Sequence, residues 1–365
     1  MLDIQELKLP AEGRVIAISD IHGDLPLLKR LLAKVTFTED DMLILNGDLC
    51  EKGPDSLSVV RFAMELMAEN QNVHITQGNC DGLVKYVFEG DEDILQYMKK
   101  RPFTILNECL AEQGRTIADF KSMEDLQAFY RPYYGKEFDW LLNLPVALET
   151  EDFLFIHAGI ENRTDWRNTS FESAVSIPDF YNKGHQSEKI VVVGHWPVVN
   201  YRAETLSHHN PRIDLEKRII AIDGGNRLKV DGQLNAFIIT CHPGKTVYSY
   251  TYVDSLERSA VVKKKHELKQ IALGTVTYPN YEMRKLREGT YFTLCENVKL
   301  GIEQLIKNEY LKEKEGVLHA NDDTSTTLLP VDGGEAVAIV DDQCTGYMLV
   351  KKEGAVGWVP KSCFE

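Results

Sequence analysis

The chain has 365 residues, of which 43% are hydrophobic and 27% are charged, so it is long enough for more than one domain and can bury a large core. Its formal net charge is −15, and residues 1–255 carry −13 of it, which argues against a nucleic-acid partner because the nucleic-acid backbone is also negative. No apolar run approaches the ~18 residues of a membrane span, and the N-terminus lacks the basic and apolar regions of a signal peptide. We therefore expect no membrane association.

The seven cysteines are scattered along the chain, their number is odd, and no Cys-x-x-Cys pair occurs. This distribution is typical of reduced thiols rather than of a disulfide framework or a structural zinc site. It predicts a cytoplasmic protein.

Short β-branched runs recur through the first two-thirds of the chain, each apolar and bounded by Gly, Asp or Asn, as buried central strands are. The predicted strands are Val15–Ile18, Met42–Leu45, Val73–Thr76, Phe153–Ile156, Ile190–Val193 and Ile219–Ile222. Apolar residues at helical spacing over 27–35 and 59–67 predict helices between the early strands. This alternation indicates an α/β core.

The rhythm breaks at residues 83–149, which are polar, aromatic-rich and helical in pattern, so we predict a helical insertion beside the site. Two further strands are expected at 235–240 and 246–253, closing a first domain over 1–255. Residues 256–365 mix short β-type segments with a polar stretch at 321–327 that has the composition of a linker.

Polar side chains follow five of the predicted strands: Asp20 and His22, Asp48, Asn79 with Asp81, His157, and His195. In open α/β sheets ligands gather beyond the carboxyl ends of the strands, so these side chains are expected to meet. A lone histidine after a strand is usually structural, but six compatible ligands at successive strand ends indicate a metal site. Mixed oxygen and nitrogen ligands suit Mn, Fe or Zn, and a pair of such ions can activate water for attack on phosphorus.

At these residues the sequence resembles the calcineurin-like metallophosphoesterases, and within them the bacterial phosphoprotein phosphatase and diadenosine tetraphosphatase branch. The likeness covers about residues 13–240. Residues 47–55 are similar to that branch's Gly-Asp-x-Val-Asp-Arg-Gly-Pro-Asp, and Ile222-Asp-Gly-Gly225 is similar to its Ile-Asp-Thr-Gly. The resemblance implies a β-sandwich of mixed sheets flanked by helices, with the site on the strand-end loops.

The resemblance also implies two divalent ions, manganese ahead of iron or zinc, and attack of a bridging hydroxide on phosphorus without a phosphoenzyme. It assigns Asp20 and His22 to the first ion, Asp48 as the bridge, and Asn79, His157 and His195 to the second ion.

The sequence departs from the branch at the residues that act in general acid catalysis and in phosphate binding. Where the branch has Gly-Asn-His-Glu, this chain has Cys80 and Asp81, so the acid that protonates the leaving oxygen is replaced by a thiol. Glu51 aligns with the acidic partner of that histidine, and Lys52 aligns with the phosphate-binding arginine. The candidate catalytic residues are therefore Asp48, Asn79, Cys80, Asp81 and Glu51, and Lys52 is a candidate phosphate-binding residue. A thiol is a poorer proton donor near neutrality than imidazole, so we expect a preference for good leaving groups. The alternative is that Cys80 is only a buried small residue.

Arg167 is a candidate for a second phosphate contact, with an ordinary surface arginine as the alternative. The leading function is a serine/threonine protein phosphatase-like phosphomonoesterase. The alternatives are hydrolysis of dinucleoside polyphosphates or another small phosphoester, and an inactive scaffold of the same fold. The expected partners are therefore a phosphorylated protein or a small phosphoester.

The C-terminal segment at about 330–365 ends in Gly357-Trp-Val-Pro-Lys-Ser-Cys363-Phe, which is similar to the closing strand of SH3-like barrels. A second small barrel is an alternative at about 266–320. Peptide-binding SH3 domains have a tyrosine where Cys363 stands, so this region is expected to be structural or to dock a protein partner in another way.

Overall fold

A computed structural model describes residues 2–201, 206–268 and 274–365. The chain forms two compact units, and each draws on separated stretches of sequence. The first unit comprises Met1–Trp196, Pro211–Leu228 and Leu234–Val253, and the second comprises Pro197–Asn210, Lys229–Gln233 and Asp254–Glu365. No helix among the described residues is both long enough and apolar enough to span a bilayer.

Two mixed sheets form the centre of the first unit. One has the order β11-β10-β2-β3-β4, and the other has the order β1-β5-β6-β7-β9-β8. The first sheet consists of β2 (Gly13–Ile18), β3 (Met42–Asn46), β4 (Val73–Thr76), β10 (Leu234–His242) and β11 (Lys245–Val253). The second consists of β1 (Ile4–Glu6), β5 (Ala147–Glu149), β6 (Phe153–Ile156), β7 (Ile190–Val193), β8 (Arg212–Asp214) and β9 (Ile219–Ala221).

Within each sheet, the strands that lead into the site run parallel to one another. In the first sheet β2, β3 and β4 run parallel, with Val15 opposite Met42 and Leu43 opposite Val73. In the second sheet β6, β7 and β9 run parallel. Parallel neighbours place their carboxyl ends at one edge, so each sheet presents several strand-end loops together.

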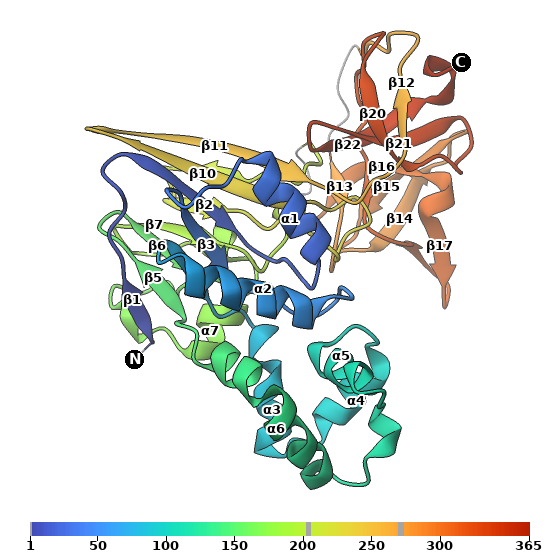
Figure 1. Ribbon diagram of the computed structural model, residues 1–365. Coiled ribbons are helices and arrows are strands. Elements are labelled where there is room, and N and C mark those ends of the chain that lie inside the picture. The colour runs from blue at the N-terminus through green and yellow to red at the C-terminus, as the bar shows by residue number, and fades with distance from the viewer. Residues whose placement is uncertain (1, 202–205, 269–273) are drawn as a thin grey trace. The chain divides into compact units, whose positions relative to one another are not determined.

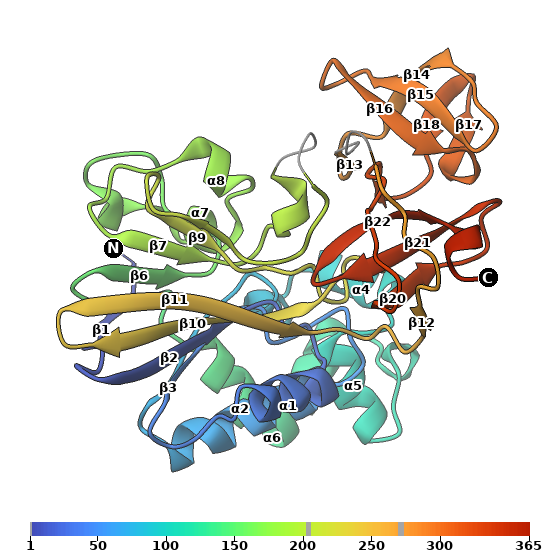
Figure 2. The same cartoon turned by 90° about the horizontal axis from the view of Figure 1, so that it is seen from above.

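The two sheets pack face to face over a shared apolar core. Its members come from both sheets and include Ala17 and Ile44 from the first and Phe155 and Val192 from the second. Helices α1 (Leu25–Lys34) and α2 (Ser56–Glu69) cover the outer face of the first sheet, and α7 (Phe171–Ser176) and α8 (Phe180–Lys183) lie on the outer side of the second (Figure 2). The first unit is therefore a β-sandwich between helical layers.

The helices of residues 84–142 lie together at one end of the sandwich (Figure 1), and their buried side chains belong to the same apolar cluster as those of α1 and α2. They are α3 (Val84–Glu89), α4 (Asp93–Lys100), α5 (Ile105–Glu112) and α6 (Met123–Leu142). Helix α6 contributes a ladder of buried aromatic side chains that includes Tyr130, Tyr134 and Phe138. The last residues of the predicted insertion, 147–149, instead form strand β5.

The second unit is rich in β-structure and contains three sheets. A four-stranded sheet has the order β12-β20-β21-β22, a five-stranded sheet has the order β16-β15-β14-β18-β17, and β13 pairs with β19. Their strands are β12 (Ser259–Val261), β13 (Thr275–Val276), β14 (Glu282–Arg287), β15 (Phe292–Asn297), β16 (Ile302–Lys307), β17 (Leu311–Lys314), β18 (Val317–Ala320), β19 (Thr324–Ser325), β20 (Ala336–Asp341), β21 (Tyr347–Lys352) and β22 (Ala355–Pro360). No ring of paired strands closes among the described residues, so the SH3-like barrels stay a prediction.

The predicted linker at 321–327 is wrong for most of its length. Thr324 and Ser325 form β19, and the side chains from Thr324 to Thr327 are buried. The hydroxyl of Ser325 donates to the carbonyl of Val356, and the hydroxyl of Thr327 donates to that of Gly274. The hydroxyls of Ser325 and Thr327 thus find hydrogen-bond partners inside the unit, which composition alone does not reveal.

Candidate metal centre

Strand-end loops bring the six predicted ligands to one edge of the sandwich. Asp20 and His22 follow β2, Asp48 follows β3, and Asn79 follows β4. The two remaining ligands, His157 and His195, follow β6 and β7 of the other sheet.

Several ligands have a backbone conformation that side-chain-bearing residues rarely adopt. Asp20, His22, Asp48 and His195 have φ values of 56°, 52°, 54° and 65°. Left-handed conformations of this kind cost roughly 1–3 kcal/mol each outside glycine and concentrate at functional sites. The tight turns they make allow each side chain to project from the end of its strand toward the centre.

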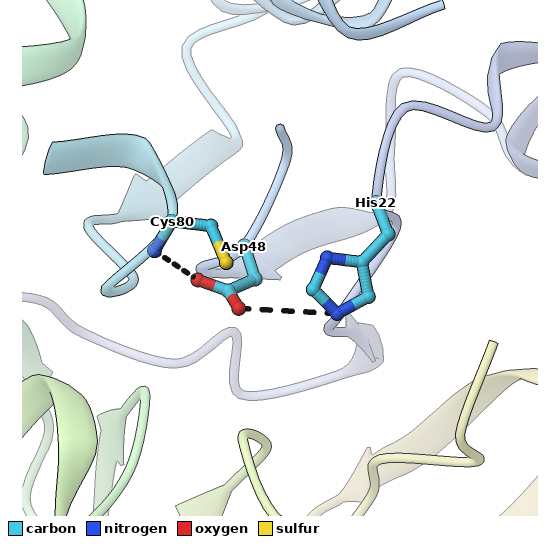
Figure 3. Close-up of side chains that lie close together, drawn as sticks. All are labelled: His22, Asp48 and Cys80. Carbon is cyan, nitrogen blue, oxygen red and sulfur yellow. Dashed lines mark hydrogen bonds and ion pairs between the residues drawn. The ribbon is translucent and has the colours of Figure 1, made fainter. Parts of the chain in front are cut away.

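Asp48 lies at the middle of the cluster. Its Oδ1 is 3.3 Å from Nε2 of His157, and its Oδ2 is 3.9 Å from Nε2 of His22. Figure 3 shows its carboxylate between the imidazole of His22 and the side chain of Cys80, whose backbone N–H donates to Oδ1 at 2.8 Å. A carboxylate with two oxygens directed at different imidazoles has the arrangement expected of a bridging ligand.

The remaining ligands join the cluster from both sides. Nε2 of His22 lies 3.8 Å from Oδ1 of Asp20, and Oδ2 of Asp20 accepts from the backbone N–H of His195 at 3.0 Å. The rings of His195 and His157 have their centroids 5.3 Å apart. Exchanging the oxygen and nitrogen of the Asn79 amide would place its nitrogen 2.8 Å from Nδ1 of His195, so the Asn79 side chain lies beside that ring. All six predicted ligands thus lie in one neighbourhood.

Backbone carbonyls fix the orientation of two imidazoles. Nδ1 of His22 lies 3.2 Å from the carbonyl oxygen of Cys50, and Nδ1 of His157 lies 3.0 Å from that of Asn46. A carbonyl can only accept, so Nδ1 carries the proton and Nε2 faces the cluster, as in most metal-binding histidines.

The protonation states also fit cation binding. Burial lowers the pKa of His22 to about 3 and that of His195 to about 4, so both rings are neutral at pH 7 and offer lone pairs. Burial opposes the charged form of His157 as well, but the carboxylate of Asp48 outweighs it and raises the pKa of His157 to about 10. A cation between Asp48 and His157 would replace that proton.

Nε2 of His22 gives the clearest test of whether a metal fits. This atom is fully buried and has no hydrogen-bond partner among the described residues. A buried, unpaired acceptor costs about 1–3 kcal/mol, and a cation would satisfy it. Ligand atoms of Asp20, Asp48 and His157 all lie within 4.8 Å of one another, as do those of His22, Asp48 and Cys80. The donor set therefore fits divalent cations with mixed oxygen and nitrogen coordination.

Glycines allow the ligand loops to approach one another. A Cβ at Gly78 would lie 2.2 Å from Oδ1 of Asp48, and a Cβ at Gly194 would lie 2.2 Å from Oδ2 of Asp20. No real side chain tolerates such distances, so any residue larger than glycine at either position would displace a ligand.

Asp81, predicted as catalytic, supports the loop that carries Asp48. Its carboxylate accepts from the backbone N–H groups of Asp48, Leu49 and Gly78 at 2.8–2.9 Å and from that of Cys50 at 3.2 Å. Four donors saturate the two oxygens, so this side chain is engaged in holding backbone.

Cys80 and Lys52 lie beside the ligands. Nζ of Lys52 is 3.7 Å from Sγ of Cys80. Burial raises the pKa of the Cys80 thiol well above its usual range, and Asp48 adds to the effect. Burial disfavours the charge of Lys52, but the surrounding negative groups outweigh it and raise its pKa to about 12. The Lys52 ammonium thus lies next to the Cys80 thiol and near the carboxylates of the site.

The side-chain hydrogen bonds of Glu51 and Arg167 are made with residues other than the predicted metal ligands. The Glu51 carboxylate accepts from the hydroxyl of Tyr97 at 2.8 Å and from the N–H of Ile105 at 2.9 Å, both in the helical insertion. The guanidinium of Arg167 pairs with Glu149 at 2.7 Å and is largely exposed. The structure does not bring Arg167 together with the ligands.

Two residues near the site were not predicted to have a role. Asp223 is fully buried, and its Oδ1 accepts from Gly225 at 2.7 Å while its Oδ2 has no partner among the described residues. The Ile222-Asp-Gly-Gly225 motif was the available signal for it. Tyr97 lies in the irregular insertion, and no sequence pattern distinguishes it from the other aromatic residues there.

Comparisons with known proteins find a matching family and several similar proteins. The family model described as calcineurin-like phosphoesterase matches residues 13–225. The symmetrical bis(5'-nucleosyl)-tetraphosphatase of Pectobacterium atrosepticum is 32% identical over 151 residues, which are 40% of this chain and 44% of that protein. The chain thus spans less than half the length of this relative.

Two further matches cover more of the chain at lower identity. The asymmetrical bis(5'-nucleosyl)-tetraphosphatase PrpE of Oceanobacillus iheyensis is 22% identical over 225 residues, 55% of this chain and 83% of that protein. The structure of a protein serine/threonine phosphatase from Saccharomyces cerevisiae covers 70% of this chain and 85% of its own, at 12% identity and a TM-score of 0.43.

Proposed function

Because the chain belongs to the calcineurin-like phosphoesterase family, we propose that it hydrolyses phosphate esters or anhydrides with two divalent cations. The observation that carries the proposal is the meeting of six ligand side chains from five strand-end loops around Asp48. One cation would be held by Asp20 and His22. The other cation would be held by Asn79, His157 and His195, and Asp48 would bind both cations. The mix of carboxylate, amide and imidazole donors suits manganese, iron or zinc, and the resemblance to the phosphatase branch leads us to propose manganese first.

When bound, the cations would supply Lewis-acid polarisation of the phosphoryl group and a nucleophilic water at neutral pH. The chain's own residues supply the rest of the site. Asp81 holds the Asp48 loop, and two backbone carbonyls keep His22 and His157 in the ligating orientation. Lys52 is charged and adjacent, so we assign it to binding phosphoryl oxygens.

The thiol of Cys80 supports a substrate with a good leaving group. It stands where the related phosphatases place an acid, and its raised pKa makes it a weak proton donor at pH 7. General acid catalysis contributes about 10²–10⁴-fold, so a substrate that needs it would be cleaved slowly here. A nucleotide leaves a phosphoanhydride readily without protonation, whereas a serine alkoxide does not.

Dinucleoside polyphosphates are therefore the substrate class that we propose. The names of the curated relatives support this choice, since they are bis(5'-nucleosyl)-tetraphosphatases. Phosphoproteins are the second candidate, because residues 47–55 also resemble the phosphoprotein phosphatases.

A substrate panel tests the proposal. The purified chain with Mn²⁺ is assayed on diadenosine tetraphosphate, an aryl phosphate and a phosphoserine peptide. We expect kcat/KM for the first two to exceed that for the peptide by about 10²-fold or more. Equal values would contradict the leaving-group argument, and absence of turnover in the metal-loaded chain would favour an inactive scaffold.

A further inference from the structure

The loop that carries Lys52 is strained where it passes the metal centre. Glu51 and Lys52 are consecutive residues with φ values of 73° and 68°, and neither is glycine. Such conformations persist only where the surrounding structure imposes them. Local contacts hold part of it, since the N–H of Glu51 donates to the hydroxyl of Ser56 at 3.0 Å, and the helical insertion supplies further contacts.

Three hydrogen bonds join the insertion to these two residues. The backbone N–H of Lys52 donates to the carbonyl of Phe103 at 3.1 Å. The Glu51 carboxylate accepts from Tyr97 on α4 and from Ile105 at the start of α5. Ile105 is the first residue of an eight-residue helix, where unpaired N–H groups favour an acidic partner.

Glu51 is thus engaged differently from its counterpart in the related phosphatases. There the acidic residue pairs with the histidine that this chain replaces by Cys80. Here both of its oxygens are taken by the insertion, and its side chain is 1% exposed. Its geometry suits a residue that fixes the neighbouring backbone.

We propose that Tyr97 and Glu51 are positioning residues that hold the Lys52 ammonium in place to bind phosphoryl oxygens. Tyr97 acts through Glu51, and Glu51 acts through the backbone that it shares with Lys52. The insertion is therefore part of the substrate-binding machinery, although it contributes none of the proposed metal ligands. The proposal rests on the proposed function, in which Lys52 contacts the phosphoryl group.

Tyr97→Phe tests the proposal, because it removes one hydroxyl and keeps the ring. The readout is binding of inorganic phosphate to the Mn²⁺-loaded full chain by calorimetry, together with metal content and steady-state kinetics. We expect the dissociation constant for phosphate to rise about tenfold, KM to rise more than kcat falls, and metal content to stay unchanged.

Tyr134→Phe is the matched control. Tyr134 is another tyrosine of the insertion, more deeply buried than Tyr97, and its hydroxyl contacts the carbonyl of Cys109 and the carboxylate of Glu112, each at 2.8 Å. Its loss should cost a similar amount of stability and leave phosphate affinity within about twofold of wild type. Glu51→Gln serves as a second variant, since the amide can accept only one of the two donors, and it should weaken phosphate binding as Tyr97→Phe does.

The outcomes separate this proposal from the proposed function. Wild-type phosphate affinity in both Tyr97→Phe and Glu51→Gln would overturn the positioning role, as would equal weakening by Tyr134→Phe. Weakened phosphate binding in a chain that hydrolyses no phosphoester would uphold the positioning role and overturn the proposed function. Failure of the metal-loaded wild type to bind phosphate would overturn both.

Discussion

Buried carboxylates at the candidate metal centre differ in what their oxygens face. Those of Asp48 face imidazoles, those of Asp81 accept four backbone N–H groups, and those of Glu51 face the insertion. The chemistry of a carboxylate depends on these surroundings, because only an oxygen with remaining lone pairs directed at the site can bind a cation or move a proton.

Glu51 should make the stability of the protein depend on pH. Burial raises its pKa to about 7, above the ordinary value of 4.5. The folded chain therefore binds this proton more tightly than the unfolded chain, and the contribution of Glu51 to the unfolding free energy falls as pH rises from about 4.5 to 7, by up to about 3 kcal/mol.

Glu51→Gln removes this titration. We expect the stability of the variant relative to wild type to improve between pH 5 and pH 8, measured by urea unfolding of the metal-free chains. Glu69→Gln, a change at an exposed glutamate, is the control and should show no such trend. A pH-independent difference for Glu51→Gln would contradict the buried, raised-pKa carboxylate.

At the residue scale, the sequence could predict which types of side chain form the site and roughly where they lie. It could not predict which partners each side chain faces. The metal ligands could be predicted from the residues that follow the strands, because parallel strands end at a common edge of the sheet. The hydrogen-bond partners of Glu51 and Arg167 could not be predicted from the sequence. Tyr97 lies 46 positions from Glu51 along the chain, and Glu149 lies 18 positions from Arg167. Such contacts depend on how loops pack.

Helix α2 begins beside the site without a cap of its own. Its N-cap residue, Asp55, makes no side-chain hydrogen bond to the helix. Glu108 on α5 takes that role from a distance, since its two oxygens accept from the N–H groups of Ser56 and Leu57 at 2.9 and 2.8 Å. The insertion thus also satisfies donors that the helix cannot satisfy itself.

Glu108→Ala should therefore lower the unfolding free energy by about 1–2 kcal/mol, as loss of a helix cap does. Urea unfolding with circular dichroism measures the change. Glu92→Ala, at an exposed glutamate beside the start of α4, is the control and should stay within about 0.5 kcal/mol of wild type. Equal stability of the two variants would show that Glu108 does not cap α2.

Elements with strong periodicity were predictable, and short ones were not. The six predicted β-branched runs all form strands, because burial on both faces requires continuous apolar sequence. Strands β1, β5 and β8 have three residues each and lack a continuous apolar run such as the one that marks β9. The buried threonines at 324–327 have polar composition and were predicted as a linker.

At the scale of the molecule, the second unit includes two loops that lie between strands of the first in sequence. Lys351 of β21 donates to the carbonyl of Asp231 at 2.8 Å and pairs with Asp254 at 3.1 Å, and Gly354 accepts from the N–H of His209. The change of composition near residue 255 could indicate a C-terminal region. It could not indicate that residues 197–210 and 229–233 join it, because these contacts are distant in sequence.

The metal content of the purified chain tests the dinuclear centre most directly. The full chain is equilibrated with Mn²⁺, freed of unbound ion and measured by mass spectrometry, beside Asp48→Asn and the exposed control Asp165→Asn. We predict about two ions per chain for wild type and the control, and about one or fewer for Asp48→Asn, because the bridging carboxylate is lost. A wild-type chain without stoichiometric metal, or an Asp48→Asn variant that retains both ions, would contradict the proposed centre.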